Sequence, residues 1–334
     1  EDGIRDIGVT GVQTCALPIW RLMFREIAKW GGFVKFSHTV FALPFAIASM
    51  AVAARGTRGW PGWRTAGLVL VAMVGARTCA MAFNRIVDRR FDARNPRTAG
   101  RHLPRGIVSL AGAMVLCAAS GGLLVLAAWG LNPLCLWLSP VALVLVCFYS
   151  LTKRFTDFTH VWLGLALAAA PAGAWLAVKG TVEFLPRVDG RIDVGHGALV
   201  PMVLSLAVLL WLVGLDIIYA TQDYEFDLRE GLHSLVVRWG PRNAMAVAFL
   251  SHLFMWAGLV VFGGLCRFRL AYWIGMVLIL ALILLEHLVA RRRDPVSINI
   301  AFFKLNGVLS VTFMVVTLLE IVFPWFRLRW AEGW

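Results

Sequence analysis

The feature that most constrains this chain is a series of nine apolar segments, each close to the roughly 20 residues that a helix needs to cross a membrane. The segments cover residues 36–54, 65–84, 107–129, 134–151, 158–178, 199–219, 243–263, 270–290 and 300–323. Hydrophobic residues make up 60% of the 334 residues and charged residues 15%, which excludes an ordinary soluble domain. The sequence therefore predicts an all-α membrane protein with about nine transmembrane helices.

The first nineteen residues are set aside, because Val9 to Ile19 reads VTGVQTCALPI, which is what a common sequencing-library adapter encodes in this frame. We interpret residues 1–19 as a non-native, adapter-derived segment and exclude them from the analysis of the fold. Residues 20–334 are then expected to form a single transmembrane domain.

The net charge of +13 does not indicate a nucleic-acid partner, because the basic residues lie between segments of membrane-spanning length. The expected partner is the lipid bilayer. If the N-terminus is cytoplasmic, nineteen Lys and Arg residues lie on the cytoplasmic side and ten on the opposite side. The positive-inside rule then places the charged stretches that follow the second and sixth segments on the cytoplasmic face. The expected location is a bacterial inner membrane, which the chain crosses several times.

The first of these stretches, Asn84 to Gly106, carries seven arginines and two regularly spaced carboxylates. Asn84, Asp88 and Asp92 are four residues apart and share one face of a helix. Two stacked carboxylates repel each other unless a cation lies between them, and oxygen-only ligands suit Mg²⁺. The arginines are suited to holding phosphate. A solvated charged loop is the alternative for this stretch taken alone.

A second stretch, Asp216 to Leu235, repeats the spacing at Asp223 and Asp227, with Asp216 two turns earlier. Two acidic helix ends at membrane exits, more than a hundred residues apart, are hard to explain as packing. They resemble the two aspartate-rich motifs of the UbiA family of intramembrane aromatic prenyltransferases, which bind a prenyl diphosphate through Mg²⁺. The resemblance runs from about Lys35 to the end of the last apolar segment.

The resemblance implies nine helices around a central cavity, with both motifs at its cytoplasmic mouth, and a single transmembrane prenyltransferase domain over residues 20–334. It implies a polyprenyl diphosphate donor, an aromatic acid acceptor and Mg²⁺ as cofactor, with the metal held by Asp88, Asp92, Asp223 and Asp227. Asp216 would support Tyr219 or a second metal ion.

Four further residues are candidates for substrate binding beside Asn84. Arg77 lies within the second apolar segment, two turns before Asn84, where an arginine costs about 2.5–3.5 kcal/mol and is usually functional or paired. By resemblance, Arg77 and Asn84 orient the acceptor carboxylate. Tyr149 and Lys153 match a Tyr-x3-Lys pair of the family whose lysine contacts the diphosphate, a role that Arg154 would share; an interfacial aromatic beside a positive-inside lysine is the alternative.

Two positions depart from the family pattern: Arg85 stands where many members have an acidic residue, and His102 where proline is usual. Phrases such as YATQDYEFD resemble the branch near 4-hydroxybenzoate polyprenyltransferases, which also includes enzymes that act on a dihydroxynaphthoate in menaquinone synthesis. The expected function is therefore Mg²⁺-dependent prenylation of a 4-hydroxybenzoate-type acid in respiratory quinone synthesis, or of 1,4-dihydroxy-6-naphthoate. The competing classes are a transporter and a membrane lipid phosphatase, although the latter lacks a recognisable nucleophile and base.

Overall fold

The computed structural model describes residues 26, 29–34, 41–188 and 191–323, so the predicted adapter-derived segment lies outside the described residues. Within these ranges, eight helices are long and apolar enough to cross a membrane. A further apolar helix, α2 (Leu43–Ala53), has 11 residues. The all-α membrane class and the approximate number of spans predicted from the sequence are confirmed.

The helices follow the predicted apolar segments in order. After α2 and the short η2 (Arg55–Thr57) come α3 (Trp63–Arg94), α4 (Leu110–Leu131), α5 (Pro133–Phe148), η3 (Tyr149–Arg154) and α6 (Thr159–Lys179). A small hairpin of β1 (Arg187–Val188) and β2 (Arg191–Ile192) and the turn η4 (Val194–His196) precede α7 (Leu199–Ala220). The chain continues with η5 (Thr221–Asp223), α8 (Tyr224–Arg229), α9 (Leu235–Leu265), α10 (Leu270–Ala290), α11 (Pro295–Asn299), the π-helix η6 (Ile300–Leu305) and α12 (Asn306–Val322).

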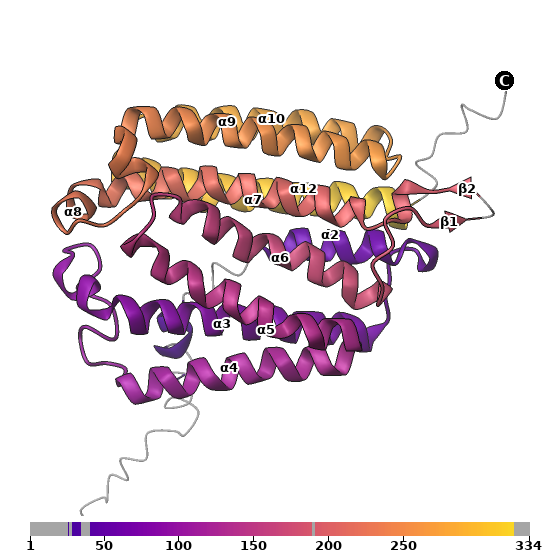
Figure 1. Cartoon of the computed structure of the whole chain (residues 1–334). Helices are drawn as coiled ribbons and strands as arrows, with labels where there is room; N and C mark the ends of the chain where they lie inside the picture. Colours follow the sequence, from indigo (N-terminus) through magenta and orange to yellow (C-terminus); the bar gives the residue numbers. More distant parts are fainter. Residues whose placement is uncertain (1–25, 27–28, 35–40, 189–190, 324–334) are drawn as a thin grey trace, which may run out of the picture.

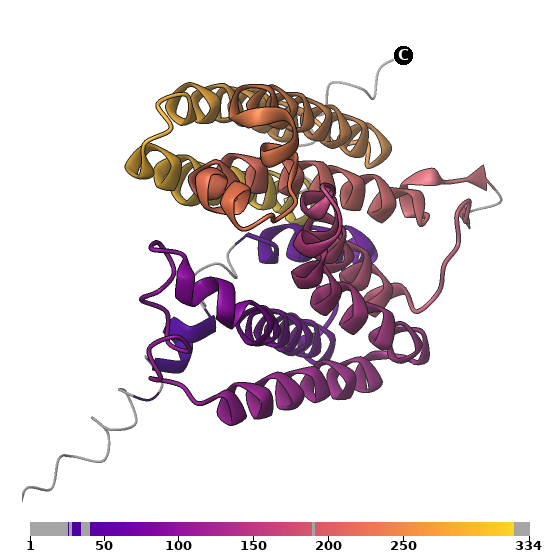
Figure 2. The same cartoon turned by 60° about the vertical axis from the view of Figure 1, so that its left-hand side comes forward.

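The long helices lie side by side with their axes roughly aligned, as a bundle seen from the side in Figure 1. The helix α3 packs mainly against α4, whereas α7 packs against both α6 and α9. The group that contains α3 and α4 meets the group that contains α7 and α9 through α6 and α2. Figure 2 shows that α3 and α7 lie on opposite sides of this middle layer. The segments that follow α3 and α7 lie at the same end of the bundle, at the left of Figure 1.

Local sequence explains where several helices begin and end. Asn132 caps α5 through its side chain, which accepts a hydrogen bond from the backbone of Cys135, and Pro133 occupies the first helical position. The predicted break between the third and fourth apolar segments is therefore real. In α9, Gly240 has φ 75° and ψ 157°, which interrupts the helix just before Pro241 and leaves the apolar part to begin beyond it.

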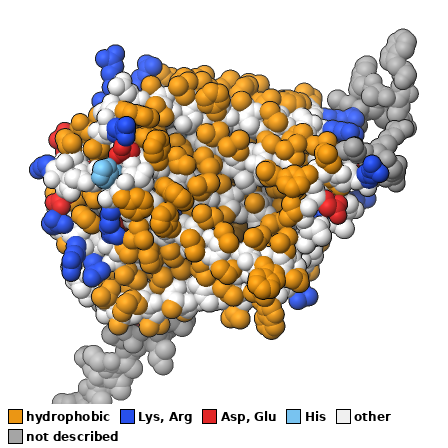
Figure 3. Space-filling view, viewed as in Figure 1, with side chains coloured by type: hydrophobic (Ala, Val, Ile, Leu, Met, Phe, Trp, Pro, Cys, Tyr) orange, Lys and Arg blue, Asp and Glu red, His pale blue; other side chains and the backbone are white. Residues whose placement is uncertain are grey.

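The molecule carries apolar side chains both inside and outside. Trp175, Trp211 and Tyr272 are fully buried in the largest core cluster, between α2, α6, α7, α9, α10 and α12. Hydrophobic side chains also cover the middle of the face seen in Figure 3, while Lys, Arg, Asp and Glu side chains gather towards its two ends. This distribution is that of a protein whose middle faces lipid and whose ends face water.

Candidate active site

The first acidic motif lies on α3, a continuous helix of 32 residues that carries the apolar segment and the charged motif without interruption. Asn84 Nδ2 donates a hydrogen bond of 3.0 Å to Asp88 Oδ2, as expected for residues one turn apart on one face. The helix ends at Arg94, because Pro96 disfavours helical angles at Asn95, which is extended. One rigid element thus sets the positions of Asn84, Asp88 and Asp92.

The second acidic motif lies where α7 gives way to η5 and α8. Asp223 ends η5 and Asp227 lies in α8, and both side chains are buried. The loop after α3 crosses to this motif: Asn95 Nδ2 donates to Asp223 Oδ1 at 3.0 Å and Arg97 Nε donates to the same oxygen at 2.8 Å. The two motifs, far apart in sequence, are therefore joined directly.

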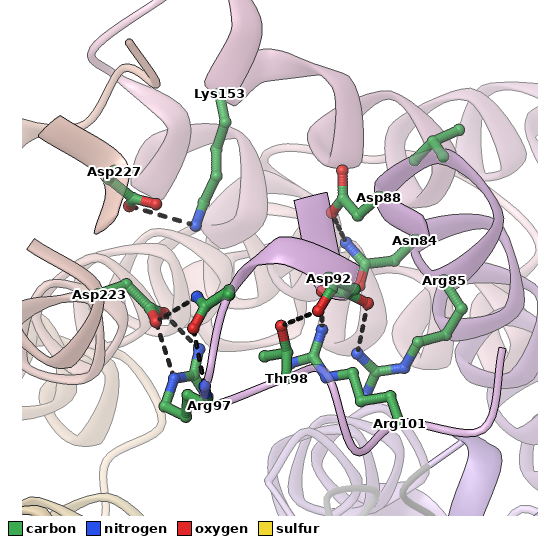
Figure 4. A network of polar contacts seen from close by, with 12 residues as sticks. Asn84, Arg85, Asp88, Asp92, Arg97, Thr98, Arg101, Lys153, Asp223 and Asp227 are labelled. Atoms are coloured by element: carbon green, nitrogen blue, oxygen red, sulfur yellow. Dashed lines mark hydrogen bonds and ion pairs between the residues drawn. The ribbon is translucent and has the colours of Figure 1, made fainter. Parts of the chain in front are cut away.

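Each of the four motif aspartates has a basic partner of its own, as Figure 4 shows for three of them. The pairs are Asp88 with Arg154 (Oδ1 to Nη2, 3.2 Å), Asp92 with Arg101 (Oδ1 to Nη1, 2.5 Å), Asp223 with Arg97, and Asp227 with Lys153 (Oδ2 to Nζ, 3.9 Å). Carboxylates gathered in a partly buried site repel one another, and the four cations offset this repulsion.

Arg97 makes the most extensive of these contacts. Its guanidinium binds both oxygens of Asp223, and Nη1 donates to Tyr219 Oη at 3.0 Å. Partial burial disfavours the charge of Arg97, but the hydrogen bonds to Asp223 outweigh it and raise the pKa of Arg97 above its usual value. Arg97 is therefore a permanent cation within the second motif.

Both motifs line one cavity of about 240 Å³, which also contains Asn84, Lys153, Arg154 and Asp216. A second cavity of about 200 Å³ adjoins it between α3, α4, α5 and α6, and its wall is mostly small apolar side chains such as Ala76, Ala142 and Ala170. Arg77, Tyr149 and Leu167 line both cavities. The site is thus a charged cavity, at the end of the bundle where both motifs lie, with an apolar cavity directly beside it.

Arg77 is half-buried at this junction, and its buried Nε has no hydrogen-bond partner among the described residues. An unpaired guanidinium N–H in such surroundings costs free energy, so the position favours an anionic ligand. Tyr149 lies beside it as part of the same wall.

Asp216 pairs with a residue that the sequence did not indicate. His160 Nδ1 lies 2.6 Å from Asp216 Oδ2, and the imidazole is fully buried at the start of α6. The Tyr219 hydroxyl, one of the two partners expected for Asp216, is bound to Arg97. The other, a second metal ion, stays a prediction. Asp216 remains at the wall of the charged cavity.

The carboxylates fit a divalent cation that is shared with a ligand. Asp92 Oδ2 and Asp227 Oδ2 are buried oxygens without a hydrogen-bond partner in the described structure. Within that same part of the chain, no three His, Cys, Asp or Glu side chains lie together as a complete metal site. Mg²⁺ is usually held by one or two carboxylates together with water and phosphate oxygens. Asp92 and Asp227 can supply the carboxylate oxygens of such a site.

Comparison with known proteins decides which family has this architecture. A model of the UbiA prenyltransferase family matches residues 42–308. The chain belongs to the UbiA prenyltransferase family. It is 31% identical over 254 residues to a 4-hydroxybenzoate octaprenyltransferase of Nitrosospira multiformis, covering 75% of this chain and 82% of that one. A protein of the same description from Coxiella burnetii is 27% identical over 252 residues, covering 75% and 82%.

Solved UbiA structures have the same fold. An apo UbiA homologue from Aeropyrum pernix K1 superposes with a TM-score of 0.73 at 29% identity, covering 85% of this chain and 98% of that one. A UbiA homologue from Archaeoglobus fulgidus, bound to GPP and Mg²⁺, superposes with a TM-score of 0.64 at 20% identity, covering 88% and 99%. These matches confirm a UbiA-type multi-pass membrane enzyme, and with the relatives above they confirm the predicted class of polyprenyltransferase.

Within this UbiA fold, the predicted site residues lie together. All ten line the charged cavity: Arg77, Asn84, Asp88, Asp92, Tyr149, Lys153, Arg154, Asp216, Asp223 and Asp227. Sequence reasoning missed Asn95, Arg97 and Arg101 as individual partners, and His160 altogether. The high density of arginines after Asp92 could have indicated Arg97 and Arg101. Nothing in the sequence pairs His160 with Asp216, which lies 56 positions away.

Proposed function

We propose that this UbiA enzyme transfers a polyprenyl group from a prenyl diphosphate to an aromatic acid of the 4-hydroxybenzoate type, with Mg²⁺ as cofactor. The observation that carries the proposal is the charged cavity with its four carboxylate–cation pairs, which adjoins an apolar cavity at Arg77. The names of the two bacterial relatives and the ligands of the Archaeoglobus fulgidus structure support the same assignment.

The donor headgroup takes the charged cavity. Asp88 and Asp92 from one side, and Asp223 and Asp227 from the other, would hold Mg²⁺, which would supply positive charge to the diphosphate oxygens. The basic side chains that pair with these carboxylates, Arg97, Arg101, Arg154 and Lys153, bind phosphate oxygens and stabilise the departing charge.

The isoprenoid tail takes the adjoining apolar cavity, whose alanine-rich wall leaves room for a branched chain. A cavity of about 200 Å³ is too small to enclose eight isoprene units, so a long donor extends from it into the bilayer. This placement keeps the allylic carbon near Arg77 and Tyr149, between the two cavities.

The acceptor lies between Arg77 and the diphosphate. The planar guanidinium of Arg77 binds the acceptor carboxylate through two parallel hydrogen bonds, and Asn84 two turns nearer the mouth orients the ring. An electron-rich ring carbon then bonds to the allylic carbon, diphosphate leaves, and the ring carbon loses its proton. Asp216, oriented by His160, is the cavity carboxylate outside the four metal ligands and accepts that proton.

We further propose that both motifs face the cytoplasm of a bacterial cell, where prenyl diphosphates are made. A cysteine introduced between residues 95 and 100 should react with an impermeant maleimide only from the cytoplasmic side. A cysteine between residues 185 and 195 should react only from outside. Labelling of both positions from one side would contradict the topology.

The decisive test is mass spectrometry of the products after membranes containing the protein receive polyprenyl diphosphate with either 4-hydroxybenzoate or 1,4-dihydroxy-6-naphthoate. The expected result is a prenylated hydroxybenzoate. A prenylated naphthoate alone would move the enzyme to menaquinone synthesis without changing the reaction type. No prenylated acid from either acceptor, with Mg²⁺ present, would overturn the proposal.

A further inference from the structure

A second polar hollow lies beside the charged cavity, on the adjacent face of α3. Its lining is Val87, Arg89, Arg90, Phe91, Arg94 and Arg154, and we call it the arginine groove. Val87, Arg90, Phe91 and Arg94 follow the i, i+3, i+4, i+7 spacing of one helical face. The groove lies at the left-hand end of the molecule in Figures 1 and 3, where basic side chains gather.

The groove contains four guanidinium groups and no carboxylate in its lining. Two of the four have an acidic partner outside it: Arg94 binds Glu230 at 2.7 Å and Arg154 binds Asp88. Arg89 donates to the carbonyl of Ile86, and in the described part of the chain neither Arg89 nor Arg90 forms an ion pair. Like charges one helical turn apart destabilise a helix, so this arrangement favours a bound anion.

The arginine groove is continuous with the charged cavity, because Arg154 and Phe91 line both. Phe91 lies between two of the cations: the guanidinium carbon of Arg94 is 5.2 Å from its ring centroid, and that of Arg154 is 5.7 Å away. Arg154 also holds Asp88. An anion that moves out of the groove past Phe91 therefore first meets Arg154, which belongs to the reaction site.

We infer that the arginine groove is a docking site for the diphosphate headgroup of the membrane-borne prenyl donor, occupied before the headgroup enters the charged cavity. This inference rests on the proposed function. The groove lies at the aqueous end of the spans, where the headgroup of an amphiphile with a buried tail is found. Guanidinium groups bind phosphate oxygens bidentately, and clustered positive charge speeds the capture of an anion.

The test removes charge from the groove without touching the reaction site. Arg89→Gln/Arg90→Gln is compared with Arg291→Gln/Arg292→Gln, which removes two charges after α10, at the same end of the bundle but outside the groove. Both are assayed in nanodiscs of neutral phosphatidylcholine. The groove variant should lose about tenfold in kcat/KM for polyprenyl diphosphate with kcat unchanged, and its kcat/KM should depend less on salt. The control variant should stay within about twofold of wild type.

Several results would overturn the inference. Equal losses in the two variants would mean that general surface charge attracts the donor. A fall in kcat without a change in KM would place the groove in the chemistry. If the groove instead binds a phospholipid headgroup, the variant should retain less phosphatidylglycerol by native mass spectrometry and show normal donor kinetics in phosphatidylcholine.

A direct measurement separates this inference from the proposed function. Equilibrium binding of polyprenyl diphosphate, without acceptor, is measured for Asp88→Asn/Asp223→Asn and for the same protein with Arg89→Gln/Arg90→Gln added. Because the reaction site is impaired in both, the residual binding reports the groove, and the added substitutions should weaken it further. Unchanged residual binding would contradict the groove, whereas absence of prenylated product in the wild type would contradict the reaction.

Discussion

The two acidic motifs have the same spacing of carboxylates, but the chain holds them in different ways. Asp88 and Asp92 lie on the uninterrupted helix α3, so the helix sets their separation. Asp223 and Asp227 lie on either side of the junction between η5 and α8, and Asp223 is held by Asn95 and Arg97 from the loop after α3. The first motif is therefore built locally, while the geometry of the second depends on the first.

The largest expected effect concerns the carboxylates, which both motifs contribute to the proposed metal site. Asp88→Asn, Asp92→Asn and Asp223→Asn should each lower kcat by more than about a hundredfold, because an amide supplies no charge to the metal. Wild-type activity should disappear in EDTA and return with Mg²⁺, measured by release of diphosphate from the donor. Full turnover in the chelator, or full activity of variants in only one motif, would show that the two motifs do not act together.

The second prediction concerns Arg77, whose substitution should affect binding of the acceptor and not binding of the donor. Arg77→Ala should leave the acceptor carboxylate without its partner at the buried junction, where loss of one member of a buried ion pair costs about 3–5 kcal/mol. Acceptor affinity should therefore fall by roughly several hundredfold or more, with prenyl diphosphate binding close to normal. Arg77→Lys should restore little, since a point charge lacks the planar fork.

Separate titrations of the two substrates against the purified variants check this prediction. If donor binding collapses while acceptor binding survives, Arg77 is a diphosphate ligand. The aromatic ring would then have to be placed elsewhere in the cavity.

The third prediction compares the loop arginines of the two motifs. Arg97→Gln should loosen Asp223, which depends on that loop, and should weaken donor binding by about tenfold or more, since hydrogen bonds to charged groups contribute about 1.5–3 kcal/mol. Arg101→Gln removes the hydrogen-bonded partner of Asp92, but Arg85 still lies 3.8 Å from Asp92 Oδ2 and α3 still holds Asp92 in place, so the effect should be smaller.

Equilibrium binding of prenyl diphosphate without acceptor measures both variants of this pair. Arg291→Gln, at the same end of the bundle but outside both motifs and the arginine groove, is the matched control for loss of one positive charge. Equal losses for Arg97→Gln and Arg101→Gln would show that the dependence of the second motif on the loop has no functional consequence.

The same contrast explains what the sequence could predict. Helical periodicity and the cost of charge in a membrane are local properties, so the spans, the face shared by Asn84, Asp88 and Asp92, and the place of Arg77 in the cavity wall followed from them. Partners that meet only through the fold did not. The pairs Arg97–Asp223 and His160–Asp216 join distant elements, and no spacing rule relates their positions.

The smallest expected effect concerns an ion-pair cluster that joins the segment before α6 to the segment after α8. Asp157, just before α6, accepts a hydrogen bond from Arg238 Nη1 at 2.7 Å and lies 3.0 Å from His233 Nδ1, which belongs to the turn after α8. The hydrogen bonds from Arg238 and then His233 hold the pKa of Asp157 below its usual range.

Because the pKa of Asp157 is lower in the folded protein than in the unfolded chain, its contribution to stability is present above the unfolded pKa of about 3.9. The contribution is lost as the pH falls through the folded pKa. Asp157→Asn should therefore lower the free energy of unfolding by less than about 1 kcal/mol at pH 7, as is usual for surface ion pairs. The melting temperatures of wild type and variant should converge as the pH is lowered past that range, and high salt should shrink the difference at pH 7. A constant gap from pH 7 to pH 3 would mean that Asp157 supports the second motif through its shape and not its charge.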